Sequence, residues 1–286
     1  MTGSDDPDRD TPIPEEDPIE TNRAKWEEYA EIHPETEYYD VPGFIADDSR
    51  STLEPPEQQL LGDLSGQSLV HLQCHIGLDT LSWARAGASV VGIDFATTAI
   101  ETAREIRDEA GLTDDAEFVC CDVFDAPETV DRAFDVVFAS YGVLCWIPDV
   151  DRWAEAAAAL CRPGGTVFLA DFHPIVDVFE SDLTLRDDRS YFREDSIRYE
   201  EDGTYADWDA SVENATAYEW QHGLGEIVTA FARAGLRIDT LREYPIANFR
   251  ACEPMIECET NRYRIDGDPL PLVYALTATA NETDVS

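Results

Sequence analysis

Short apolar runs alternate with amphipathic stretches along the middle of the chain. The runs are SLVHLQC, ASVVGIDF, AEFVCCDV, AFDVVFASY and GTVFLADF, and the stretches with helical spacing are DTLSWARAG, TAIETAREIRDEAG and DRWAEAAAALC. Gly87 is expected to end the first helix, and Thr98 with Glu101 has the capping-box spacing that begins the second. Strand and helix in alternation predict right-handed crossovers and a parallel sheet with helices on both faces.

The same alternation returns near the end of the chain. Residues 223–236 have helical spacing, and the segments 237–244 and 271–280 have the composition of strands. These two segments complete an open, mostly parallel sheet of about seven strands. We therefore predict an α/β fold of the doubly wound, Rossmann-like class.

Three segments fall outside this repeating pattern. Residues 1–20 are an acidic leader with the composition of a disordered segment, and residues 21–60 predict a helical N-terminal flap. Residues 174–221 lose the period and become rich in acidic and aromatic residues, which predicts an insertion or lid after the fifth strand. The principal domain is then expected to span 61–286.

Acidic residues outnumber basic ones by 61 to 20, for a formal net charge of −41. This balance opposes binding to nucleic acid, whose phosphates need a positive surface. The acids are spread along the chain, which suggests a high-salt cytoplasm in which ions screen their repulsion. No apolar run is long enough to span a membrane, and aspartates occupy the place of a signal peptide's basic region, so we expect a cytoplasmic protein.

The chemistry of the predicted fold is expected at the carboxyl ends of its strands, where open parallel sheets bind ligands. Asp94 follows the second strand and can accept both hydroxyls of a ribose, although it could also be a solvated loop acid. Phe95 could lie against an adenine or simply pack. Asp122 follows the third strand and could accept from an adenine amino group or merely end the strand, while Ser140 and Tyr141 end the fourth.

The ordered segments SLVHLQCHIGLDT, VVGIDF, FVCCDVFD, FDVVFASYGVLCWIPD and LCRPGGTVFLADFHP resemble the class I S-adenosylmethionine-dependent methyltransferase family. The resemblance implies that the loop at 73–80 holds the methionine end of S-adenosylmethionine, that Asp94 binds its ribose and that Asp122 meets its adenine. The candidate cofactor-binding residues are Gln73, His75, Gly77, Asp79, Asp94, Phe95, Asp122, Val123 and Ser140.

The first loop departs from the family's pattern of an acid followed by three alternate glycines. Aligned on Gly77, the sequence has His71 at the acid and Gln73 and His75 at the first two glycines. This form resembles a subgroup of the family that also has an NR...W flap and a segment like WQHGLGEI. Side chains such as Gln73 or Asp79 could replace the missing contacts. The absence of G-x-G-x-x-G makes a nicotinamide-dependent oxidoreductase a poor alternative.

Histidines are the candidate catalytic residues. His173 and His222 fall where an acceptor would enter and could remove its proton, although His173 could also pack beside a proline and His222 could cap a helix. His71 and His75 are four apart on a strand and loop, a poor arrangement for a metal, and the seven cysteines have no zinc or disulfide spacing.

Methyl transfer needs above all a closed pocket that holds the acceptor in line, and aromatic side chains can build one. The candidate acceptor-binding residues are Trp26, Tyr29, Tyr141 and Trp220. We therefore predict a methyltransferase that uses S-adenosylmethionine on a small molecule and works as a monomer or homodimer. The alternative is a module of the same fold that binds the cofactor or a nucleoside without catalysis.

Overall fold

A computed structural model describes residues 16–192, 194–250, 252–259 and 261–281. Its central sheet has seven strands in the order β3-β2-β1-β4-β5-β11-β8, and only β11 runs antiparallel to its two neighbours. The strands are β1 Ser68–Leu72, β2 Ser89–Asp94, β3 Ala116–Cys120, β4 Phe134–Ser140, β5 Cys161–Phe172, β8 Leu236–Tyr244 and β11 Val273–Ala280. The predicted α/β class and its mostly parallel seven-stranded sheet are confirmed.

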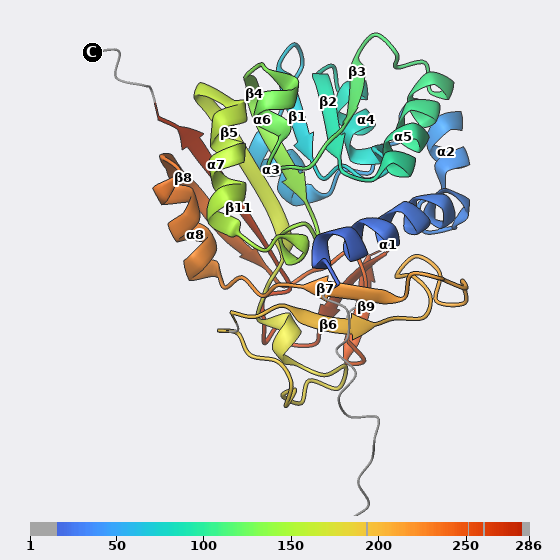
Figure 1. Cartoon of the computed structure of the whole chain (residues 1–286), viewed down its shortest axis with the longest axis vertical. Helices are drawn as coiled ribbons and strands as arrows, with labels where there is room; N and C mark the ends of the chain where they lie inside the picture. Colours follow the sequence, from blue (N-terminus) through green and yellow to red (C-terminus); the bar gives the residue numbers. More distant parts are fainter. Residues whose placement is uncertain (1–15, 193, 251, 260, 282–286) are drawn as a thin grey trace, which may run out of the picture.

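Helices cover both faces of this sheet (Figure 1). They are α4 Leu78–Arg85, α5 Thr97–Glu109, α6 Ala126–Val130, α7 Val150–Leu160 and α8 Leu224–Arg233. Alternate residues of β4 point to opposite faces: Val137 packs in the core under α7 and α8, whereas Phe138 packs in the core under α4 and α5. Burial on both sides explains why the strands read as continuous apolar runs.

The N-terminal flap consists of α1 Pro18–Ile32, η1 His33–Glu35, α2 Val41–Ala46 and α3 Pro55–Leu61. Most of the expected leader, residues 1–15, lies outside the described residues, but its last three residues form the first turn of α1. Asp17 caps this helix by accepting from the main-chain N–H of Ile19, and Pro18 occupies a first-turn position where a missing N–H costs nothing.

The segment 174–221 contains η3 Val176–Val178 and a two-stranded antiparallel sheet of β6 Ile197–Glu200 and β7 Thr216–Glu219. This small sheet lies against α1, below the main sheet in Figure 1. The Asn22 side chain on α1 donates to the main-chain oxygen of Tyr218 at 2.7 Å and accepts from its N–H at 2.9 Å. The flap and the insertion are therefore joined directly to each other.

One further hairpin, β9 Met255–Glu259 with β10 Arg262–Ile265, was not expected from the sequence. Cys258 belongs to β9, whose side chains are exposed after Met255. The two strands have only five and four residues, so the alternation of apolar and polar positions in them is too short to be distinctive. Across the described part of the chain, no helix has the length and apolar character needed to cross a membrane.

Candidate cofactor and acceptor site

Asp94, at the end of β2, connects the loop after β2 to the loop after β1, which leads from the strand beside which the strand order reverses. Its Oδ2 accepts from the main-chain N–H of His75 at 2.8 Å, and its Oδ1 accepts from the N–H of Ala96 at 2.9 Å. The side chain is buried, and burial raises the pKa of Asp94 to about 6. Because each carboxylate oxygen has two lone pairs, both can still accept from a ligand hydroxyl.

The loop after β1 follows the backbone path of a glycine-rich turn although it contains one glycine. Gln73, His75 and Gly77 have φ angles of 57°, 49° and 79°, which lie in the left-handed region that glycine adopts easily. These are the three positions where the family pattern has glycine. The loop therefore keeps the required backbone conformation and adds two side chains to it, at a steric cost for each.

Gly77 is needed for packing. A Cβ atom at this position would lie 2.6 Å from the ring of Phe118 on β3. Its role as a cofactor-binding residue stays a prediction.

The side chains of Gln73 and Asp79 hold the loop to its neighbours. Gln73 donates from Nε2 to the main-chain oxygen of Val143 at 3.0 Å, and its Oε1 accepts from Trp153 Nε1 at 2.9 Å. Both polar groups of its amide are thus engaged within the protein.

Asp79 accepts from Thr52 Oγ1 at 2.5 Å and from Ser140 Oγ at 3.0 Å, and burial raises its pKa. The predicted cofactor residues Asp79 and Ser140 are therefore in contact with each other. They connect α4, the end of β4 and the flap.

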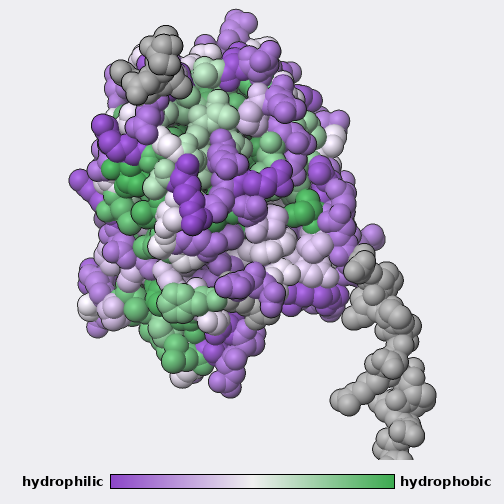
Figure 2. Space-filling model, turned by 60° about the vertical axis from the view of Figure 1, so that its left-hand side comes forward, coloured by the Kyte–Doolittle hydropathy of each residue, from purple (hydrophilic) through white to green (hydrophobic). Residues whose placement is uncertain are grey.

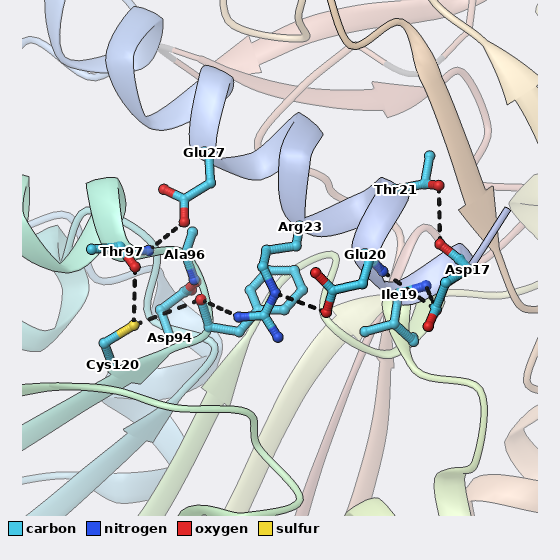
Figure 3. A network of polar contacts seen from close by, with 11 residues as sticks. Asp17, Ile19, Glu20, Thr21, Arg23, Glu27, Asp94, Ala96, Thr97 and Cys120 are labelled. Carbon is cyan, nitrogen blue, oxygen red and sulfur yellow. Dashed lines mark hydrogen bonds and ion pairs between the residues drawn. The ribbon is translucent and has the colours of Figure 1, made fainter.

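The loop after β2 is covered by α1 (Figure 3). Arg23 donates from Nη1 to the main-chain oxygen of Phe95 at 2.7 Å, and its guanidinium lies 4.9 Å from the centre of the Phe95 ring. The expected place for an adenine on this ring is thus shared with an arginine. Within the described residues, Asp122 accepts from the N–H of Phe124 at 2.9 Å, and Val123 points into the core.

The predicted capping box of Thr98 and Glu101 is wrong. The N-cap of α5 is Ala96, which has no capping side chain, and the carboxylate of Glu27 on α1 accepts from the N–H groups of both Thr97 and Thr98 at 2.7 Å. Figure 3 shows the contact with Thr97. These hydrogen bonds lower the pKa of Glu27. An acid from another helix supplies the negative charge that a helix N-terminus favours.

A group of rings that we call the aromatic cluster lies over the loop after β1. Its members are Trp26, Tyr29, His33, Tyr39, His75, Trp146 and Tyr205. Trp26 is at its centre, with ring centroids 5.2 Å from His75 and 5.3 Å from Trp146. The flap, the loops after β1 and β4 and the insertion all contribute, so the predicted acceptor residues Trp26 and Tyr29 are brought beside the predicted cofactor residue His75.

His33 and Tyr205 belong to this cluster but were missed in the sequence. His33 follows Trp26 by seven residues and so continues the same face of α1, which is the signal that could have revealed it. Tyr205 lies in the irregular insertion, where no period indicates which side chains point inward. Within the described part of the chain, no three His, Cys, Asp or Glu side chains gather as a metal would require.

The other predicted residues lie outside the cluster's ring contacts. Tyr141 packs on Phe172 with centroids 5.8 Å apart, and Trp220 joins the loop after β4 through its N–H, which donates to the oxygen of Cys145 at 2.8 Å. The contacts of Tyr141 and Trp220 do not indicate a ligand.

His173 uses both ring nitrogens within the protein. Its Nδ1 accepts from the N–H of Ile175 at 3.1 Å, which leaves the proton on Nε2 facing Glu243 Oε1 at 3.0 Å. His222 donates from Nε2 to the oxygen of Ile147 at 2.7 Å. His222 Nδ1 has no hydrogen-bond partner among the described residues and lies 3.4 Å from Glu226 Oε1, so the catalytic role of these two histidines stays a prediction.

Residues 70–165 match the family model described as a methyltransferase domain. This match covers less than half of the chain and shows that the segment is similar to methyltransferase domains. Two curated relatives that this part of the chain resembles are named ubiquinone biosynthesis O-methyltransferase. The protein from Ralstonia nicotianae is 36% identical over 115 residues, which cover 40% of this chain and 47% of the relative, and that from Bordetella pertussis is 34% identical over 113 residues, 40% and 46%. The chain thus spans about half the length of the curated relatives it matches.

Solved structures of methyltransferases share the fold. The S-adenosylmethionine-dependent methyltransferase from Mesorhizobium loti has a TM-score of 0.53 at 19% identity and covers 79% of this chain and 96% of its own. The CcbJ methyltransferase from Streptomyces caelestis has a TM-score of 0.57 at 14% identity, with 91% and 99% covered. Nearly the whole of each of these methyltransferases aligns with this chain, so the similarity in fold extends beyond residue 165, where the match to the family model ends.

Proposed function

We propose that the protein transfers a methyl group from S-adenosylmethionine to a small-molecule acceptor. The observation that carries the proposal is the buried carboxylate of Asp94 at the end of β2, which accepts from the main chain of the loop after β1, beside the switch point between β1 and β4. Two hydroxyls of a ribose can complete its hydrogen bonds, as in other sheets of this class.

The contacts of the flap and the insertion support a small acceptor. Arg23 and Glu27 hold α1 against the loops after β2, while Tyr205 and Tyr39 close the aromatic cluster from outside. A site covered on this side suits a small molecule better than a polymer, and the acidic composition disfavours nucleic acids in particular. The names of the curated relatives support an oxygen atom as the acceptor, and the composition supports a high-salt cytoplasm as the location.

The first experiment is calorimetric titration with S-adenosylmethionine and with S-adenosylhomocysteine in 2 to 3 M KCl. We expect both to bind, and Asp94→Ala to weaken both by at least about tenfold because two ribose hydroxyls lose their acceptor. The matched control is Asp115→Ala, an exposed acid at the opposite end of the sheet, before β3. Failure of the wild-type protein to bind either compound would refute the proposed function.

A second candidate function is a cofactor-binding module without methyl transfer. The occupied side chains of Gln73 and Asp79 favour it, because two of the groups expected to bind the methionine end have partners within the protein. Turnover separates the two candidates: binding of S-adenosylmethionine without S-adenosylhomocysteine production, across phenols, alcohols, amines and thiols, would support the binding module.

A further inference from the structure

Two histidines face each other inside the aromatic cluster. His33 Nδ1 on the flap lies 2.8 Å from His75 Nε2 in the loop after β1, and the two ring planes are at 86°. The distance is that of an N–H···N hydrogen bond, so one nitrogen carries the proton and the other accepts it.

The pair is neutral as a whole. Burial lowers the pKa of His33 to about 2 and that of His75 to about 3, so neither ring holds a second proton at neutral pH. Each imidazole then has one proton, and the outer ends of the pair, His33 Nε2 and His75 Nδ1, must differ. One end presents an N–H and the other a lone pair.

His33 Nε2 is the buried end. His33 is fully buried, and its Nε2 has no hydrogen-bond partner among the described residues. A buried polar atom without a partner is costly and in native proteins needs an explanation. His75 is only partly buried, so a proton can leave the pair on its side.

The pair lies next to the carboxylate that is proposed to bind the ribose of the cofactor. The main-chain N–H of His75 donates to the proposed ribose-binding carboxylate of Asp94. Around His33, the ring of Tyr39 stacks at 5.0 Å and the ring of Tyr205 lies at 4.8 Å. Tyr205 is partly exposed, so movement of this residue of the insertion would open a path from solvent to His33.

We infer that His33 and His75 form a two-histidine proton relay that deprotonates an acceptor carrying an O–H or N–H group. This inference rests on the proposed function. As the bond between acceptor oxygen or nitrogen and the methyl carbon forms, the bond from that carbon to the cofactor's sulfur breaks and the acceptor's proton passes to His33 Nε2. The Nδ1 proton of His33 passes to His75 Nε2, and His75 releases its Nδ1 proton to water.

The relay resolves a conflict that a single buried base would face. An imidazole in this environment cannot retain an added positive charge, since burial disfavours the charged form. In the relay each ring gains one proton and loses another, so both end neutral with their tautomers reversed. Water then restores the starting tautomers.

The relay predicts which acceptors depend on His33 and which do not. Acceptors that must lose a proton, such as catechol, need His33, whereas an acceptor without a proton, such as iodide, does not. Both reactions use the same cofactor and the same methyl transfer. A residue that only supports the packing of the cluster would affect both reactions alike.

The experiment compares His33→Gln and His75→Gln with the wild-type full-length chain, using catechol and iodide as acceptors in molar KCl. We expect each variant to lower kcat for catechol by about 100-fold or more, the usual size of a general-base contribution. For His33→Gln, iodide methylation and the Kd of S-adenosylhomocysteine are expected to change by less than about threefold. Glu31→Gln, a change at an exposed acid of α1, is the control, and it is expected to change neither reaction.

Equal losses with catechol and iodide, or undiminished catechol turnover, would overturn the relay. So would an equal loss of catechol turnover in the Glu31 variant. Nitrogen-15 NMR of the histidine rings in the complex with S-adenosylhomocysteine gives a readout independent of turnover. We expect His33 Nε2 to be unprotonated and His75 Nδ1 to be protonated at pH 7, and a proton on His33 Nε2 excludes the relay even if neither acceptor is methylated. Failure of S-adenosylhomocysteine to bind refutes the proposed function instead.

Discussion

At the scale of residues, the site depends on side chains in backbone conformations that usually require glycine. Gln73 and His75 accept the left-handed conformation, and their side chains then bind Trp153 and His33. A glycine loop has no such contacts. The strain in this loop is therefore offset by tertiary contacts, which is common where a site is held in one geometry.

The buried carboxyl of Asp94 predicts a dependence of stability on pH. Its pKa is raised from 3.8 to about 6 in the folded state. The group thus stabilises the folded state fully below about pH 4, and this contribution, about 3 kcal/mol, is lost as the pH rises through about 6. In Asp94→Asn we expect this decrease in stability with rising pH to disappear. The free energy of unfolding in urea, measured for both proteins at pH 4, 5, 6 and 7 in molar KCl, tests this. Parallel pH profiles of the two proteins would contradict a raised pKa for Asp94.

Gly77→Ala tests the packing of the loop. The added Cβ meets the Phe118 ring in a left-handed residue, so we expect a loss of about 2 to 4 kcal/mol in the free energy of unfolding. Gly111→Ala is the control, because Gly111 has a similar φ of 71° with nothing within 4 Å. It is expected to lose only about 1 kcal/mol. Equal losses in denaturant titrations would show that the Phe118 contact has no effect.

At the scale of elements, the sequence pattern predicts strands and helices, but it does not predict which side chains meet in the tertiary structure. The strands of the main sheet were predictable because burial on both faces leaves continuous apolar runs. The cap of α5 was not, since Glu27 reaches it from α1, 70 residues away. The contact between His33 and His75 joins residues 42 apart, and nothing in either local segment indicates the partner.

Glu27→Gln tests the connection between α1 and α5. The neutral amide is a weaker acceptor for the two N–H groups and lacks the charge that favours a helix N-terminus, so we expect a loss of about 1 kcal/mol. The affinity for S-adenosylmethionine is expected to fall too, because the loop after β2 loses its cover. Glu31→Gln, an exposed acid on the same helix, is the control for thermal melts and titrations. Equal behaviour of the two variants would argue against the cap.

At the scale of the whole molecule, the net charge of −41 is the main source of electrostatic repulsion in the folded state. Hydrophilic residues spread over the face seen in Figure 2, and the hydrophobic ones gather in separate patches between them. With so many like charges, the compact state repels itself unless ions screen the charges. We therefore expect the folded state to need concentrated salt for its full stability.

Salt should therefore stabilise the fold strongly. We expect Tm to rise steadily between 0.1 and 2 M KCl, with the steepest change at the low end, where the screening length shortens most. Sucrose at matched osmolality is the control, because it adds no ions. A melting temperature that does not respond to KCl, or responds equally to sucrose, would show that charge repulsion is not the main destabilising force.

Helix α1 touches both halves of the site: its Glu27 and Arg23 bind the loops after β2, and its Asn22 binds β7 of the insertion. Because one helix contacts both sides of the site, we expect binding of the cofactor to affect binding of the acceptor. If α1 closes on the cofactor and carries the insertion with it, turnover follows a compulsory order, with the cofactor first and its demethylated product last to leave. S-adenosylhomocysteine would then inhibit competitively against S-adenosylmethionine and noncompetitively against the acceptor, and Asn22→Ala would relax that order toward random binding.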